Sequence, residues 1–176
     1  YPTYYKNYQN GIDPQAKVNQ VIDWLKLPIN ERPKLICLYF NEPDHSGHVY
    51  GANSKEVNEQ IKESDNILGY LMDSLKKLNI YDNINIVIVS DHGMVNVSED
   101  KVINIDDFNL PGEFEGKGPL MSYKIDSDDL YKISNITIPH IKIVPAVKND
   151  KLHYNNTIYD FLLLADEGWM LYSNKD

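Results

Sequence analysis

The chain has 176 residues, 42% of them hydrophobic, and a formal net charge of -9. That length suits one core of ordinary size, so we expect a single domain over residues 1–176. The negative charge argues against a basic surface for a nucleic acid polymer, and an anionic substrate would need positive charge from bound metal. A single cysteine, Cys37, excludes a disulfide framework. No apolar stretch approaches the roughly 20 residues of a membrane span.

Near the N-terminus the sequence predicts a helix followed by a buried strand. The helix is expected over residues 14–26, because Asp13 is a typical N-cap and Pro14 is typical of a first helical turn. The segment over residues 34–40 is short and, after Lys34, continuously apolar. This pattern predicts a strand that is covered on both faces.

A second helix and a second strand are expected next. A polar loop leads to Asn53, which with Glu56 has the spacing of a capping box, and apolar residues then recur at helical intervals as far as Leu78. Residues 84–89 form another β-branched apolar run. Strand, helix and strand in this order predict a right-handed βαβ unit with parallel strands.

The second half of the chain has a less regular pattern. Strand-like runs occur near residues 120–125, 140–144 and 159–164. Between them and the first half, glycine and proline predict a loop over residues 107–120. The sequence therefore favours an α/β fold.

Two pairs of metal-type residues follow the two predicted parallel strands. Asp44 and His48 lie four residues apart on the expected polar loop, and Asp91 and His92 are adjacent. Adjacent side chains of a strand point to opposite faces, so the second pair can bind one ion only if the chain turns, which Gly93 permits. Aspartate oxygen and histidine nitrogen are donors that catalytic zinc accepts.

A single Asp-His pair in a loop is more often structural or merely solvated than a metal site. Two pairs after consecutive parallel strands are stronger, because such strands bring their carboxyl ends to one crevice. They suit two ions about 3.5 to 4 Å apart, which can activate an oxygen nucleophile and stabilise charge at phosphorus.

The residues around these pairs resemble a known family. The sequence contains YFNEPDHSGHVYG, LMDSLKKLNI and SDHGM, and later LHYNN and LLLADEGW. Together these segments are similar to the ectonucleotide pyrophosphatase/phosphodiesterase family of the alkaline phosphatase superfamily, from about Pro2 to Trp169. The resemblance implies an alkaline-phosphatase-like three-layer fold with a mainly parallel sheet, present here as a partial domain.

The resemblance also implies a cofactor set of two Zn²⁺ ions. The EPDxxGH motif assigns Asp44 and His48 to one zinc, and the SDHGM motif assigns Asp91 and His92 to the other. The family completes its site with an upstream Asp, a nucleophilic Thr and a further downstream His in an HGxDN-like stretch, and none of these is in this sequence. The resemblance therefore implies an internal portion of a catalytic domain that needs the remainder of that domain.

The activity implied is hydrolysis of phosphodiester or pyrophosphate bonds in nucleotides or dinucleoside polyphosphates, releasing nucleoside monophosphate. Tyr8 falls where nucleotide-cleaving members stack a tyrosine on the base, and the alternative is that Tyr8 only packs on the surface. Two other functions stay open: a phosphodiesterase for choline-bearing lysophospholipids, and a catalytically silent ectodomain used for recognition.

Three N-x-S/T sequons, at Asn96, Asn135 and Asn155, suit an extracellular glycoprotein. In a chain this rich in asparagine some would arise by chance, so they are a weak indication. With the family resemblance they predict a secreted or cell-surface ectodomain. Any membrane attachment would come from an anchor outside this sequence.

Overall fold

A computed structural model describes residues 2–133, 136–147, 154 and 157–174 of the chain. The chain forms two compact units, residues 1–94 and residues 95–176, and each is described by itself. The single domain expected over residues 1–176 stays a prediction. No helix in the described residues combines the length and apolar character needed to cross a bilayer.

The first unit is built on two helices that begin at side-chain caps. Helix α1, Pro14–Leu25, starts after Asp13, whose carboxylate accepts a hydrogen bond from the Gln15 N–H at 3.0 Å. This confirms the predicted cap and proline. Helix α3, Lys55–Lys77, is capped by Ser54, whose hydroxyl accepts from the Val57 N–H at 3.1 Å.

Two predictions about this region were wrong. The cap of α3 is Ser54 and not Asn53, because the extended backbone of Ser54 lets its hydroxyl reach the third N–H of the helix. The predicted polar loop contains helix α2, Asp44–Tyr50. A short 3₁₀ turn, Tyr81–Asn83, follows α3.

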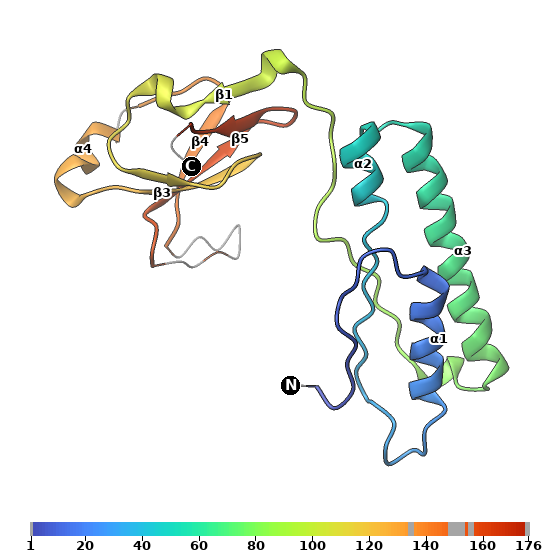
Figure 1. Ribbon diagram of the computed structural model, residues 1–176. Helices are drawn as coiled ribbons and strands as arrows, with labels where there is room; N and C mark the ends of the chain where they lie inside the picture. The colour runs from blue at the N-terminus through green and yellow to red at the C-terminus, as the bar shows by residue number, and fades with distance from the viewer. Residues whose placement is uncertain (1, 134–135, 148–153, 155–156, 175–176) are drawn as a thin grey trace. The chain divides into compact units, whose positions relative to one another are not determined.

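The core of the first unit lies between α1 and α3 (Figure 1). Helix α1 contributes four buried side chains at helical spacing, and α3 adds Ile67 and Leu75. Alternate side chains of the extended segment over residues 34–40 pack against this cluster, namely Ile36, Leu38 and Phe40. Ile84, at the start of the second extended segment over residues 84–89, packs against it as well. The helices therefore cover one face of the first segment and the start of the second.

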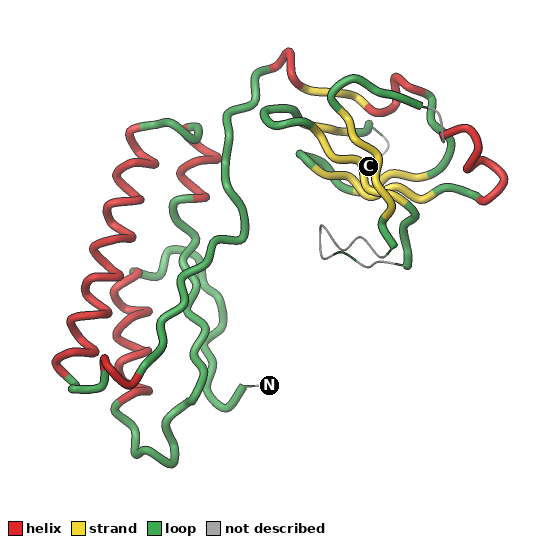
Figure 2. Tube along the Cα trace, turned by 180° about the vertical axis from the view of Figure 1, so that it is seen from behind, coloured by secondary structure: helices red, strands yellow, loops and turns green. Residues whose placement is uncertain are grey.

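The predicted βαβ strands are wrong for this structure. Residues 34–40 and 84–89 form no named strand among the described residues and run as loop (Figure 2). The outer face of the first segment stays exposed, with Leu35 82% accessible, and residues 85–89 of the second are exposed throughout, with Val87 80% accessible. For residues 34–40 the sequence predicted cover on both faces, but the described chain supplies it on one, and extended backbone becomes a strand only when a neighbour pairs with it.

The second unit contains a four-stranded antiparallel sheet in the order β2-β3-β5-β4. Its strands are β2 Glu113–Glu115, β3 Leu120–Lys124, β4 Ile141–Pro145 and β5 Phe161–Ala165. The three predicted strand runs are thus confirmed in this sheet. The loop predicted over residues 107–120 is wrong in part, because β2 lies within it and pairs with β3.

A parallel pair accompanies this sheet. Strands β1 Val102–Asn104 and β6 Met170–Tyr172 pair in register, with Ile103 opposite Leu171. Short helical turns connect the strands: Glu99–Lys101, Ile105–Phe108, Ser127–Asp129 and helix α4 Leu130–Ile133.

Tyr123 is the centre of the core of the second unit. Its side chain is fully buried, its ring stacks on Phe114 at 4.5 Å between centroids, and its hydroxyl donates to the Pro111 carbonyl. Gly112 has φ +104°, and a β-carbon there would overlap the Lys124 carbonyl oxygen, so only glycine lets the chain return this closely. Burial, and then the charge of Asp129, raise the pKa of Tyr123 to about 12.

Alkaline pH should therefore destabilise the second unit. The folded state favours the neutral phenol, so this stabilisation is complete below the unfolded pKa of about 10 and is lost as the pH rises towards 12. Tyr123→Phe should cost about 1 kcal/mol at neutral pH and reduce the alkaline loss. Unfolding midpoints measured across this range, with the exposed Tyr131→Phe as control, test this. An alkaline loss of the same size in Tyr123→Phe would contradict it.

Candidate metal centre

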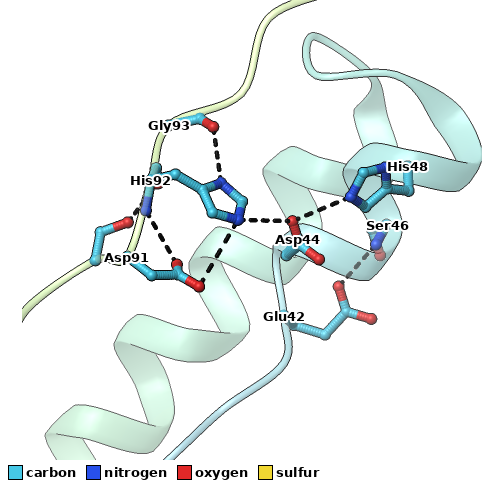
Figure 3. A network of polar contacts seen from close by, with 8 residues as sticks. Glu42, Asp44, Ser46, His48, Asp91, His92 and Gly93 are labelled. Atoms are coloured by element: carbon cyan, nitrogen blue, oxygen red, sulfur yellow. Dashed lines mark hydrogen bonds and ion pairs between the residues drawn. The ribbon is translucent and has the colours of Figure 1, made fainter. Parts of the chain in front are cut away.

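Helix α2 presents the first predicted pair on one face. Asp44 and His48 are one helical turn apart, and His48 Nε2 lies 3.4 Å from Asp44 Oδ1 (Figure 3). Because the sequence was expected to form a loop here, the helical geometry was missed. The i, i+4 spacing of the two residues was the signal that could have indicated it.

Glu42 supports the first turn of α2. Its Oε2 accepts a hydrogen bond from the Ser46 N–H at 3.0 Å, which satisfies one of the free donors at the helix start. Sequence reasoning also missed this residue. A carboxylate directly before a proline at a helix start is the available signal, since a negative charge is favourable there.

The second pair lies where the extended segment over residues 84–89 ends. The chain bends at Asp91, and the His92 N–H donates to Asp91 Oδ1 at 3.1 Å. His92 Nδ1 lies 2.9 Å from the Gly93 carbonyl oxygen, which can only accept, so Nδ1 carries the proton. In the neutral ring, Nε2 then keeps its lone pair, and it lies 3.7 Å from Asp91 Oδ2.

The two pairs meet in one cluster within the first unit (Figure 3). His92 Nε2 lies 3.8 Å from Asp44 Oδ1, the same oxygen that faces His48. That oxygen is buried and has no hydrogen-bond partner among the described residues. A buried carboxylate oxygen without a donor is unfavourable, and a bound cation would satisfy it.

The cluster is electrostatically suited to a cation. The hydrogen bond to the Gly93 carbonyl, and then the charge of Asp91, raise the pKa of His92 above its ordinary value, with a smaller contribution from Asp44. Carbonyl and carboxylate groups around an imidazole hold its ring in place and make its free nitrogen a better electron-pair donor.

The donor spacings within each pair are close to those of zinc ligands. Two ligands of a tetrahedral zinc, each about 2.0 to 2.2 Å from it, lie roughly 3.3 to 3.6 Å apart. The pair Asp44 and His48, at 3.4 Å, matches this range, and Asp91 with His92, at 3.7 Å, is close to it. Among the described residues no group of three or more His, Cys, Asp or Glu side chains is placed to hold an ion by itself.

Tyr8 is not in this polar cluster. Its ring is 63% exposed and meets Tyr39 edge to face at 6.2 Å between centroids. Tyr39 is also exposed and lies five residues before Asp44 in the sequence. Sequence reasoning did not single out Tyr39, because it lies in an apolar run that was expected to be buried.

Of the three predicted glycosylation sites, one lies in the described part of the chain. Asn96 is exposed at the start of the second unit. Asn135 and Asn155 lie outside the described residues.

Comparison with known proteins identifies the relatives of this chain. The sequence matches the family described as type I phosphodiesterase / nucleotide pyrophosphatase over residues 1–176. It is 35% identical over 182 residues to a bis(5'-adenosyl)-triphosphatase of Xenopus laevis, covering 99% of this chain and 40% of that protein. It is 33% identical over 194 residues to venom phosphodiesterase 2 of Crotalus adamanteus, covering 99% of this chain and 24% of that protein.

A solved structure is similar over the whole chain. Murine ectonucleotide pyrophosphatase / phosphodiesterase 5 matches with a TM-score of 0.81 and 28% identity, covering 100% of this chain and 49% of that one. This match confirms the predicted alkaline-phosphatase-like α/β fold, as part of a larger domain. Because the family match spans the chain from end to end, the chain belongs to the type I phosphodiesterase / nucleotide pyrophosphatase family.

Proposed function

We propose that the protein containing this chain is a zinc-dependent phosphodiesterase that cleaves phosphodiester or pyrophosphate bonds in nucleotides. The observation that carries the proposal is the convergence of His48 and His92 on a buried Asp44 oxygen that lacks a hydrogen bond. Membership of the family supports the reaction class. A protein of net charge -9 also needs a local source of positive charge to receive a phosphate.

In this proposal Asp44 and His48 hold one zinc, and Asp91 and His92 hold the other. Two zinc ions, when bound, supply positive charge to the phosphate and polarise an attacking oxygen. Glu42 keeps the first turn of α2 in place through the Ser46 N–H, and the Gly93 carbonyl orients His92 through Nδ1. The chain spans about two fifths of the frog relative, and we place the threonine nucleophile and the other ligands in parts of the domain outside this sequence.

The proposed substrates are extracellular nucleotides or dinucleoside polyphosphates. One relative is named for hydrolysis of a bis(5'-adenosyl) triphosphate, and the murine structure has also been solved in complex with AMP. The exposed Tyr8 ring, beside Tyr39, offers a face on which any nucleobase can stack. We also propose a secreted or cell-surface location, for which the exposed sequon at Asn96 is a weak indication.

The full-length protein should release AMP from bis(5'-adenosyl) triphosphate. A chelator should lower the rate at least about a hundredfold, and added zinc should restore it, because the site lacks positive charge without metal. The isolated 176 residues should bind zinc weakly and show no turnover. Product analysis by chromatography checks both statements. Brisk hydrolysis by the fragment alone, or full activity after complete metal removal, would contradict the proposal.

Asp44→Asn should separate metal binding from stability. The change removes a negative ligand, so zinc affinity should fall at least about 100-fold. It also removes charge from a buried oxygen without a partner, so the metal-free free energy of unfolding should stay the same or rise by up to about 1 kcal/mol. Chelator competition and denaturant unfolding measure the two quantities. Asp73→Asn on α3 is the control, and a purely structural Asp44 would lose stability without losing zinc.

Tyr8→Ala should test the nucleobase contact. Loss of about 1 to 3 kcal/mol of stacking should raise KM for the nucleotide about 5- to 150-fold, while Tyr8→Phe keeps the ring and stays near wild type. Hydrolysis of bis(para-nitrophenyl) phosphate, which has no base, should change little in either variant. Equal losses on both substrates would remove the stacking role.

Faster wild-type cleavage of a lysophosphatidylcholine than of nucleotides would favour the choline-lipid alternative.

A further inference from the structure

An asparagine is followed directly by a glycine once in the chain, at Asn10 and Gly11. Both residues are exposed and form a turn just before Asp13, the N-cap of α1. Gly11 has φ +75°, a left-handed angle that glycine adopts without steric cost. The turn therefore favours a residue without a β-carbon directly after an asparagine.

An asparagine in this position has a chemical reactivity of its own. The main-chain nitrogen of the following residue can attack the side-chain amide carbon of the asparagine, because the two atoms close a five-membered ring. A β-carbon on the following residue hinders this attack, and glycine has none. A hydrogen bond from the attacking nitrogen also hinders it, since the nitrogen is then held away from the asparagine side chain.

The structure leaves the reacting groups of the turn accessible. Neither the Asn10 amide nor the Gly11 N–H makes a hydrogen bond to another described residue. A β-carbon built on Gly11 would meet nothing within 4 Å, so the ring has room to form. Asn53 is also exposed and precedes the small residue Ser54, but the Ser54 N–H donates to the Gly51 carbonyl at 3.1 Å. Asn10 is therefore the less protected of these two asparagines.

We propose that Asn10 is a site of spontaneous deamidation. The Gly11 nitrogen forms a bond to the Asn10 side-chain carbon and loses its proton, and the side-chain nitrogen leaves as ammonia, so that a succinimide ring remains. One water molecule then opens the ring. Attack of water at the side-chain carbonyl gives aspartate, and attack at the main-chain carbonyl gives isoaspartate. No electrons are gained or lost, and the net reaction takes up water and releases ammonia.

The two products change the segment between Tyr8 and α1. Each adds a carboxylate to a chain whose formal net charge is already -9. Isoaspartate also adds one carbon to the main chain, because the backbone then continues through the former side chain. Aspartate thus alters the charge alone, whereas isoaspartate alters both the charge and the course of the backbone before the Asp13 cap.

Ageing the full-length protein tests the proposal. After prolonged incubation, peptide mapping by mass spectrometry should find the side-chain amide of Asn10 replaced by a carboxyl group, relative to unaged protein. An isoaspartate methyltransferase with radiolabelled S-adenosylmethionine should transfer methyl groups to the aged protein. Both signals should grow faster at mildly alkaline pH than at neutral pH, because the attacking nitrogen must lose a proton.

Two variants identify the residue that reacts. Asn10→Gln should remove most of the methyl acceptance, because glutamine would have to close a less favourable six-membered ring. Asn53→Gln is the matched control and should leave methyl acceptance at the wild-type level. Both positions are exposed and lie outside helices and strands, so neither exchange should change the free energy of unfolding by more than about 0.5 kcal/mol.

The outcomes decide the proposal without reference to zinc. Deamidation at Asn10 that disappears in Asn10→Gln supports it. An unmodified Asn10 in the aged protein, or equal methyl acceptance in Asn10→Gln and wild type, overturns it. Neither readout depends on metal binding or turnover, so this inference and the proposed function can fail separately.

Discussion

The first unit depends on two extended segments that pack against helices α1 and α3, the first through one whole face and the second through its first residue. Ile36, Leu38 and Phe40 from the first segment and Ile84 from the second pack on the same helical cluster. The hydrophobic effect is non-directional and does not by itself orient a segment. Side chains of an extended chain alternate between two faces, so only every second one can reach the helices, and this fixes which face turns towards them. The first segment is thus anchored along its length and the second at Ile84, and each leads into one of the two Asp-His pairs.

Local hydrogen bonds then convert this anchoring into a defined arrangement of donors. Glu42 holds the start of α2, and the carbonyl of Gly93 holds the ring of His92. The Asp44 oxygen where the pairs meet gains no such bond among the described residues. The apolar contacts therefore bring the motifs near one another, and the polar ones decide which atoms face inward.

Much of this could be predicted from the sequence where the cause was local. The cap and proline of α1, the length of α3 and three strands of the second unit followed from spacing and turn residues. The four metal-type residues were found as pairs, and the structure brings all of them into one cluster. Their ligation of metal is still a prediction.

The remaining features depend on contacts that one sequence does not reveal. Helix α2 was missed because Pro43 and Gly47 are typical of loops, and the sequence does not show that Gly47 packs beside Met94. Strand pairing over residues 34–40 and 84–89 was predicted wrongly, because an apolar run shows that burial is favourable but not which neighbour provides it. The parallel pair of β1 and β6 joins segments too short to have a clear pattern.

The exposed outer face of those extended segments has a consequence for the newly made chain. Runs rich in β-branched and apolar residues with open backbone groups tend to associate with one another before their neighbours cover them. Here charged residues flank both runs: Lys34 and Glu42 border the first, and Asp82 and Asp91 border the second. Such flanking charges oppose self-association. Glu42 and Asp91 therefore combine two properties, since each makes a local hydrogen bond at the polar cluster and also places a negative charge at the end of an apolar run.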